Sequence, residues 1–210
     1  MTPRYDWSEP SLRGAAGIVR GGGVIAFPTE TFYGLGACPF DARAVQRIFD
    51  LKGRSFRSAP ILVLIRSRAD LAALVSEITP AAERLMEACW PGPLTLVFHA
   101  AAAVPSVLTA GTGTIGVRLP AHPDVQRLLE AVGGPLTGTS ANRSGQPPAT
   151  RAEDVDWALG DGVDAVLNGG PTPGGLPSTV VDTTVMPPRV IREGRVSTAA
   201  VLAIINSMAA

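Results

Sequence analysis

Short apolar runs alternate with amphipathic stretches along the whole chain, and no other feature constrains the fold as strongly. The runs are typical of buried strands and lie at 24–27, 61–65, 94–98, 115–119, 165–167, 180–181 and 190–191. The stretches between them predict helices at about 10–20, 41–51, 67–75, 80–89, 123–132, 151–159 and 198–208. Strands interleaved with helices in this way predict a mixed α/β fold.

Several helix starts carry capping signals. Thr79 precedes a proline, which fits an N-cap followed by proline at the first helical position. Residues 150–153 fit a capping box, and Asp41 and Ser67 are candidate caps. By contrast, segment 169–177 holds too many glycines and prolines for regular structure, and it is either a flexible lid or a long connection.

Bulk composition excludes several classes of protein. With 210 residues the chain forms one large domain or at most two small ones, and no internal repeat is visible. Its 18 basic and 18 acidic residues balance, so the whole protein is not expected to be drawn to nucleic acid. Two cysteines without a Cys-x-x-Cys motif predict neither structural zinc nor a disulfide framework. We find no signal-peptide core and no membrane-spanning run, so we expect a cytoplasmic enzyme.

Lys52 is the only lysine among the 18 basic residues, and it stands in the sequence Lys52-Gly53-Arg54. An ammonium is a compact charge that fits among phosphate or carboxylate oxygens, whereas a guanidinium is a wide planar fork. With Arg57, three cations lie within six residues, which favours a phosphate chain over a solvated helix face. A surface lysine retained by chance is the alternative. Neither a P-loop motif nor a Gly-x-Gly-x-x-Gly motif is present.

Two further segments are rich in hydroxyl groups and glycine. Segment 27–36 follows a predicted strand, and segment 137–145, after the strand-like 135–136, holds four hydroxyl side chains and one amide. Such loops offer donors to a nucleotide or an acid group. Arg118 lies within an apolar strand, where its charge requires a partner, either an internal acid or an anion of a ligand.

The histidines give no support for covalent catalysis. Only His99 and His122 are present, and neither fits a Ser-His-Asp arrangement. The chemistry left to the chain is positioning and electrostatic stabilisation of an anionic substrate.

Six segments resemble, in order and over about Gly22 to Arg195, the YrdC-like family of threonylcarbamoyl-AMP synthases. These segments are 28–36, 52–54, 90–95, 116–120, 140–145 and 178–182. The resemblance implies a twisted mixed β-sheet flanked by helices around a positive concave cavity. It also implies a nucleotidyltransferase that converts L-threonine, bicarbonate and ATP into threonylcarbamoyl-adenylate and pyrophosphate. The product would serve the t6A37 modification of tRNA, through the tRNA threonylcarbamoyl-transfer proteins.

The resemblance also implies roles for particular residues. Lys52 and Arg54 would hold the ATP phosphates and carry catalysis, and Arg118 would bind the threonine carboxylate. The other implied contacts to ATP are Ser58, Thr114, Ser140, Asn142 and Arg192, and the other contacts to threonine are Thr31 and Ser178. Mg²⁺ would be held mainly by ATP phosphates, without a metal site in the protein.

Three departures from the family pattern are visible. Residues 55–60 differ from many relatives, which affects the role of Ser58, and Val63 or Leu64 stands where archaeal-type members have a threonine-contacting histidine. The extra C-terminal domain of the long family members is not expected, so 1–210 should form a single YrdC-like domain.

Two other functions compete with this interpretation. A double-stranded RNA- or tRNA-binding module without catalysis would use the basic residues between Arg43 and Arg68, but no aromatic platform accompanies them. Direct binding of tRNA by an enzyme stays open. A hydrogenase-maturation carbamoyltransferase would need acylphosphatase-like and zinc-finger segments upstream, and we find neither.

Overall fold

Two mixed β-sheets form the framework of the protein in a computed structural model, which describes residues 2–206 apart from the side chain of Ser58. The first sheet has the order β1 (Arg4–Tyr5), β9 (Ala165–Leu167), β2 (Ile25–Pro28), β3 (Tyr33–Gly36) and β8 (Thr139–Ser140). The second has the order β11 (Arg189–Arg192), β10 (Thr179–Asp182), β5 (Leu94–His99), β6 (Thr114–Arg118), β4 (Val63–Leu64) and β7 (Leu136–Thr137). The expected mixed α/β class is confirmed.

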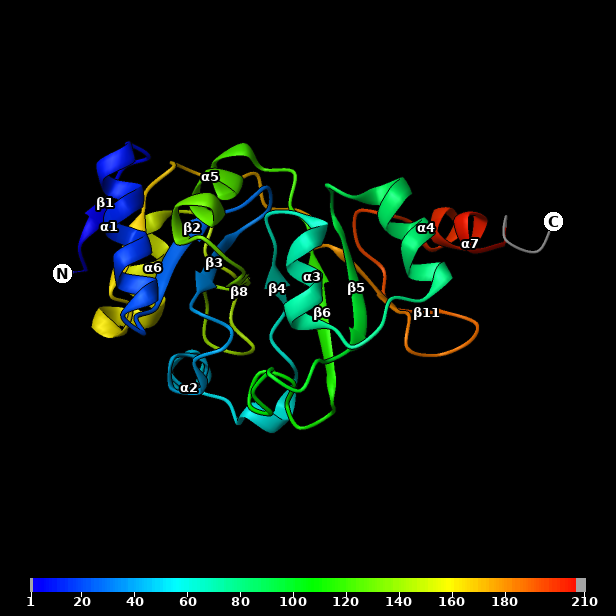
Figure 1. Cartoon of the computed structure of the whole chain (residues 1–210). Coiled ribbons are helices and arrows are strands. Elements are labelled where there is room, and N and C mark those ends of the chain that lie inside the picture. The colour runs from blue at the N-terminus through cyan, green and yellow to red at the C-terminus, as the bar shows by residue number, and fades with distance from the viewer. Residues whose placement is uncertain (1, 207–210) are drawn as a thin grey trace.

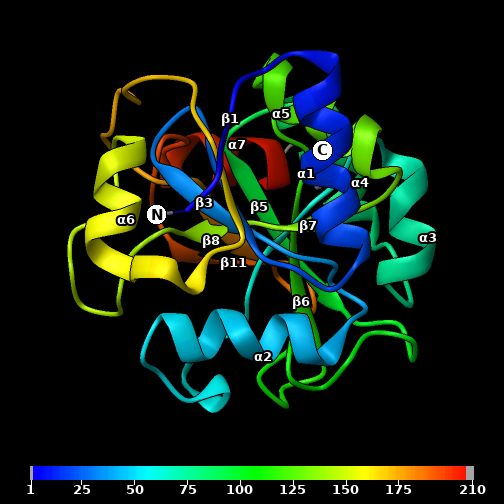
Figure 2. The same cartoon turned by 90° about the vertical axis from the view of Figure 1, so that its left-hand side faces the viewer.

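Helices cover both sheets. They are α1 (Glu9–Arg20), α2 (Ala42–Leu51), α3 (Leu71–Leu74), α4 (Pro80–Cys89), α5 (Pro123–Val132), α6 (Ala152–Leu159) and α7 (Thr198–Asn206), with short 3₁₀ turns at Phe56–Ser58, Arg68–Asp70 and Gly160–Gly162. Helix α1 packs beside α5, and α4 packs beside α7 (Figure 1). Both views place α2 on the side of the molecule opposite α5 (Figure 2). No helix within 2–206 is long and apolar enough to cross a membrane.

The β2–β3 hairpin shows how the apolar runs specify the core. Strand β2 is buried on both faces, because Ala26 faces the larger cluster of core residues and Phe27 faces a smaller one beneath α1 and α5. A continuous apolar run is therefore required there rather than an alternating one. Antiparallel pairing of Pro28 with Tyr33 leaves Thr29–Phe32 as the tip of the hairpin. The hairpin thus sets the position of two threonines and one glutamate.

The predicted helices are confirmed within one or two residues, except that 67–75 is a 3₁₀ turn followed by the short α3, and that 207–208 lie outside the described residues. The caps at Asp41 and Thr79 are confirmed, since each side chain accepts backbone N–H groups of its helix. Ser67 stands at the predicted N-cap position of the 3₁₀ turn, but its side chain makes no capping hydrogen bond. The capping box is shifted: Asp154, not residue 153, accepts the N–H groups of residues 150 and 151.

Strands β1, β3 and β8 were not predicted, and strand 61–65 is shorter than predicted. Strand β3 was missed because its two glycines lower strand propensity. Close packing requires glycine at position 36, since a Cβ there would lie 2.7 Å from the ring of Phe27. The glycines of segment 27–36 therefore serve packing between strands as well as the neighbouring cavity.

Candidate active site

A cavity of about 750 Å³ lies between the two sheets. Strands β3 and β8 of the first sheet and β4, β5, β6, β10 and β11 of the second contribute residues to its walls. All the predicted site residues with described side chains line it: Thr31, Lys52, Arg54, Thr114, Arg118, Ser140, Asn142, Ser178 and Arg192. The side chain of Ser58 is outside the described part of the chain. The fold thus gathers residues that lie as much as 161 positions apart in the sequence (31 to 192).

The cavity is positively charged. Four of the residues that line it are cationic, and none of the lining residues in the described part of the chain is acidic. Because the chain as a whole has no net charge, this concentration of cations is local. The expected positive concave cavity is confirmed, and it favours an anionic ligand.

Lys52 is a buried hydrogen-bonding centre at the end of α2. Only 4% of the residue is exposed, and its Nζ lies 2.6 Å from the Ser140 carbonyl oxygen and 3.1 Å from both the carbonyl and Oδ1 of Asn142. An ammonium has three protons, so these acceptors account for all of them. Burial, followed by repulsion from Arg54, lowers the pKa of Lys52 to about 8. Lys52 therefore fixes the loop that carries Ser140 and Asn142.

Arg54 and Arg192 carry charge that no acidic side chain neutralises in the described ion pairs. Arg54 lies over the Phe49 ring at 5.3 Å and donates weakly to the Ala59 carbonyl at 3.5 Å, while its Nε is buried without a partner. Arg192 donates to the Ser178 carbonyl oxygen at 2.8 Å. Burial lowers the pKa of both guanidinium groups. Both are held in place by neutral groups, which leaves their charge for a ligand.

Hydroxyl groups also line the cavity. Ser178 shares a 2.9 Å hydrogen bond with Thr95, a cavity residue that sequence reasoning did not single out. Thr31 lies 3.3 Å from the Thr29 hydroxyl, which itself donates to the Phe32 carbonyl oxygen at 2.8 Å. These contacts hold Thr31 and Ser178 on the cavity wall.

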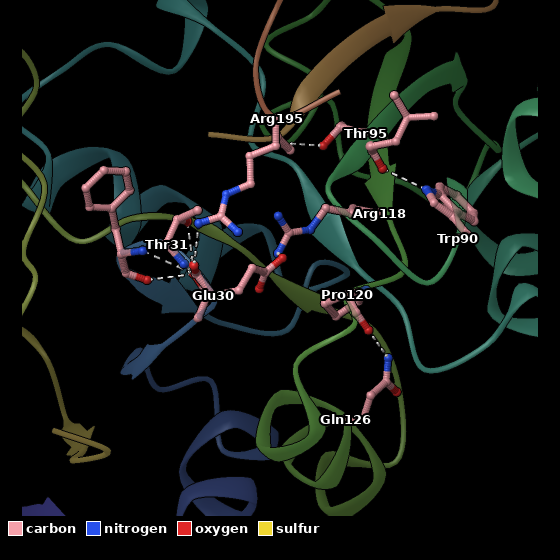
Figure 3. Close-up of polar contacts among 12 residues, drawn as sticks. Glu30, Thr31, Trp90, Thr95, Arg118, Pro120, Gln126 and Arg195 are labelled. Atoms are coloured by element: carbon pink, nitrogen blue, oxygen red, sulfur yellow. Dashed lines mark hydrogen bonds and ion pairs between the residues drawn. The ribbon is translucent and has the colours of Figure 1, made fainter. Parts of the chain in front are cut away.

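Arg118 has an internal acidic partner and also lines the cavity. Its Nη2 lies 2.8 Å from Oε1 of Glu30, at the tip of the β2–β3 hairpin (Figure 3). The side chains are 6% and 19% exposed, so this ion pair is largely buried. Burial lowers the pKa of Arg118, and the Glu30 carboxylate opposes that shift. The two alternatives for Arg118 are therefore compatible, because one side of the guanidinium faces an acid and the other is available to a ligand.

Arg195 is a third charged residue here that sequence reasoning missed. Its Nη2 donates to the Glu30 backbone carbonyl at 3.2 Å, and its guanidinium lies beside that of Arg118, whose pKa it helps to lower (Figure 3). The signal that could have found Glu30 was its charge between two threonines in segment 27–36. Arg195 lies at the end of the resemblance but outside its six segments.

The glycine- and proline-rich segment 169–177 is anchored at several points. The Tyr33 hydroxyl donates to the Gly170 carbonyl oxygen at 2.8 Å, and the backbone N–H groups of Thr172 and Gly174 donate to carbonyl oxygens of Thr150 and Thr31. After these anchors, Gly175 and Pro177 line the cavity and Leu176 is 61% exposed. Because the Pro177 carbonyl oxygen accepts the Arg195 backbone N–H at 3.0 Å, the part with freedom to move is Gly175 and Leu176.

Nothing in residues 2–206 resembles a metal site formed by protein ligands, since no three His, Cys, Asp or Glu side chains are grouped.

Comparisons with known proteins agree with this geometry. The family model Sua5_yciO_yrdC, described as telomere recombination, matches residues 17–194. A threonylcarbamoyl-AMP synthase of Pyrococcus abyssi is 44% identical over 186 residues, 89% of this chain and 54% of that protein. One from Nitrosococcus oceani is 41% identical over 161 residues, 75% of this chain and 85% of that protein.

Two solved structures share the fold. Pyrococcus abyssi Sua5 complexed with L-threonine has a TM-score of 0.91 and 40% identity, covering 98% of this chain and 61% of that one. Escherichia coli YciO has a TM-score of 0.84 and 31% identity, covering 93% of this chain and 97% of that one. The chain spans little more than half the length of the Pyrococcus abyssi relatives.

Proposed function

The chain belongs to the Sua5–YciO–YrdC family, and from that premise we propose that it acts as a threonylcarbamoyl-AMP synthase. The proposed reaction joins L-threonine, bicarbonate and ATP into threonylcarbamoyl-adenylate and releases pyrophosphate. The observation that carries the proposal is the cavity between the sheets, where four cations and several hydroxyl groups lie without an acidic side chain. The likeness to a Pyrococcus abyssi protein that binds L-threonine supports the same amino-acid substrate.

The chemistry needs two steps. The threonine amine attacks bicarbonate, a nitrogen–carbon bond forms, and water leaves to give a carbamate. A carbamate oxygen then attacks the α-phosphorus of ATP, and the bond to pyrophosphate breaks. An ionised carbamate needs no general base, so positioning and charge stabilisation are sufficient for the second step.

The cationic residues have different proposed roles in binding ATP. Arg54 and Arg192, whose charges are uncompensated, would contact the phosphates directly. Lys52 would add a positive charge nearby and hold Ser140 and Asn142 against the nucleotide, because its three protons already bind that loop. Thr114 and Ser58 complete the proposed nucleotide contacts.

At the amino-acid end, Arg118 would bind the threonine carboxylate while Thr31 and Ser178 would contact the rest of the molecule. Mg²⁺ would enter with ATP, because the cavity offers hydroxyl groups and cations rather than the carboxylates that a protein-held Mg²⁺ requires.

The wider setting is part of the proposal. The adenylate would pass to the tRNA threonylcarbamoyl-transfer proteins for t6A37 modification, in the cytoplasm, and residues 1–210 would act as one YrdC-like domain. Direct contact with tRNA is not required by any of these steps.

The test is pyrophosphate release in the presence of ATP, Mg²⁺ and bicarbonate, with each amino acid in turn. We expect release with L-threonine and little with the others, and none when ATP is omitted. Pyrophosphate release that does not depend on threonine, or its absence from a folded protein under all conditions, would contradict the proposal.

A further inference from the structure

A second cavity, of about 420 Å³, adjoins the first at the tip of the β2–β3 hairpin. Thr29 lines both cavities, Arg118 lines only the larger and Glu30 only the smaller. The Arg118–Glu30 ion pair therefore stands at the boundary between them. Trp7, His122 and Arg195 also line the smaller cavity, and none of the roles proposed above uses them.

The walls of the smaller cavity hold buried polar atoms without hydrogen-bond partners. They are Nε1 of Trp7, Nδ1 of His122 and, beyond the ion pair with Arg118, both carboxylate oxygens of Glu30. An unsatisfied buried polar group costs about 1–3 kcal/mol, so groups of this kind are rare in native proteins. Their grouping around one cavity points to a polar ligand that satisfies them.

The charges identify the ligand as a small anion. Arg195 has no acidic partner in the described ion pairs, and its guanidinium donates to the neutral Glu30 carbonyl oxygen at 3.2 Å. The indole N–H of Trp7 can only donate. Asp124, the other acid on the wall, is compensated by Arg127 at 3.3 Å. Arg195 and Trp7 therefore face the space, and both acids on its wall, Glu30 and Asp124, already have a cationic partner.

Glu30 restricts which anion fits. Its carboxylate can only accept hydrogen bonds when ionised, so it repels anions that lack a proton and binds one that carries an O–H group. Bicarbonate has one O–H donor and two oxygens that accept from Arg195 and Trp7. Acetate, formate and nitrate have no such donor.

We propose that the smaller cavity binds bicarbonate and holds it beside the threonine site, an inference that rests on the proposed function. Glu30 accepts the bicarbonate O–H, and Arg195 and Trp7 donate to its other oxygens. The position next to Arg118 brings the carbon of bicarbonate close to an amino acid whose carboxylate Arg118 binds. The rest of the cavity has room for the water that carbamate formation releases.

Two variants test the proposal by kinetics. Trp7→Phe removes one N–H donor and keeps an aromatic ring, and Arg195→Gln removes the cation. In buffers freed of dissolved CO₂, we expect the KM for bicarbonate to rise about five- to tenfold in the first and more than tenfold in the second, with the KM for threonine and ATP within about twofold of wild type. Trp157→Phe and Arg189→Gln, at exposed positions, are matched controls that should change none of these constants.

A binding measurement separates this inference from the proposed function. Line broadening of ¹³C-bicarbonate, measured by NMR with the whole protein and no other substrate, should appear with wild type and the controls and weaken in both variants. Equal broadening in wild type and Arg195→Gln would overturn the site, whether or not the protein releases pyrophosphate. A rise confined to the KM for threonine would overturn it as well, and would assign the cavity to the amino acid.

Discussion

At the scale of single residues, Lys52 combines a structural and an electrostatic role. A guanidinium could not replace its ammonium, because three acceptors converge on one nitrogen atom. Its importance could be predicted from its being the only lysine in the sequence, but its hydrogen bonds could not, because they join residues 88 and 90 positions apart. The sequence predicts that Lys52 contacts phosphate. In the structure Lys52 first of all joins the end of α2 to Ser140 of β8 and to Asn142 by hydrogen bonds.

The titration of Lys52 gives the first prediction. Burial lowers its pKa to about 8, so the free protein should lose this proton near pH 8, whereas ATP phosphates favour the ammonium and should raise the pKa. Because an unfolded lysine keeps its proton to about pH 10.4, this group should make the free energy of unfolding rise with pH between about 8 and 10. Selective ¹³C,¹⁵N-lysine labelling reports Lys52 alone by NMR. A pKa near 10.4 without ATP would contradict the prediction.

The Arg118–Glu30 pair gives a second prediction at this scale. Arg118→Gln leaves a largely buried carboxylate without its cation, so the free energy of unfolding should fall by about 3 kcal/mol. Glu30→Gln in the same chain should restore most of that loss, because the uncompensated charge is removed as well. Calorimetric titration should show threonine affinity reduced at least tenfold in both the single and the double variant. Purely additive losses of stability would show that the two side chains are not coupled.

At the scale of elements, the sequence predicted helix boundaries correctly where residues adjacent in the chain determine them. Helices α4 and α5 begin and end where the pattern predicts, since Thr79 and the prolines at both starts act within one turn. Strand β3 could not be predicted, because its glycines are explained by Phe27 on the facing strand and by Leu136, about a hundred residues later in the chain. The contact between Glu30 and Arg195 could not be predicted for the same reason, since only the fold brings the two residues together.

The caps provide a matched comparison. Asp41 accepts two backbone N–H groups at the start of α2, the helix that ends at Lys52, so Asp41→Ala should lower the free energy of unfolding by about 1 kcal/mol. Ser67 makes no capping hydrogen bond, so Ser67→Ala should change it by less than about 0.5 kcal/mol. Denaturant unfolding of both variants measures the difference. Equal losses would show that the Asp41 cap does not contribute more to the free energy of unfolding than Ser67 does.

At the scale of the whole molecule, the cavity depends on two sheets that meet through their connections. Segment 169–177 is one of these connections, since it runs from β9 of the first sheet to β10 of the second. The sequence left open whether it is a lid or a plain link. The anchors at Gly170, Thr172 and Gly174 hold its first part and the Arg195 N–H holds the Pro177 carbonyl oxygen at 3.0 Å, so any closure is limited to Gly175 and Leu176.

The last prediction concerns this short end of the segment. Ligands that fill the cavity should hold Gly175 and Pro177 against it and shield Leu176, which is 61% exposed in the free protein. A protease that cuts before leucine should therefore cleave at Leu176 more slowly when ATP and threonine are both present than with either alone. Leu202, 43% exposed on α7 and not among the residues that line the cavity, serves as the control site and should be cut at an unchanged rate. Because the cavity joins both sheets, an equal slowing at Leu202 would indicate general stabilisation of the fold rather than closure of this segment, and unchanged cleavage at Leu176 would leave the segment as a plain connection.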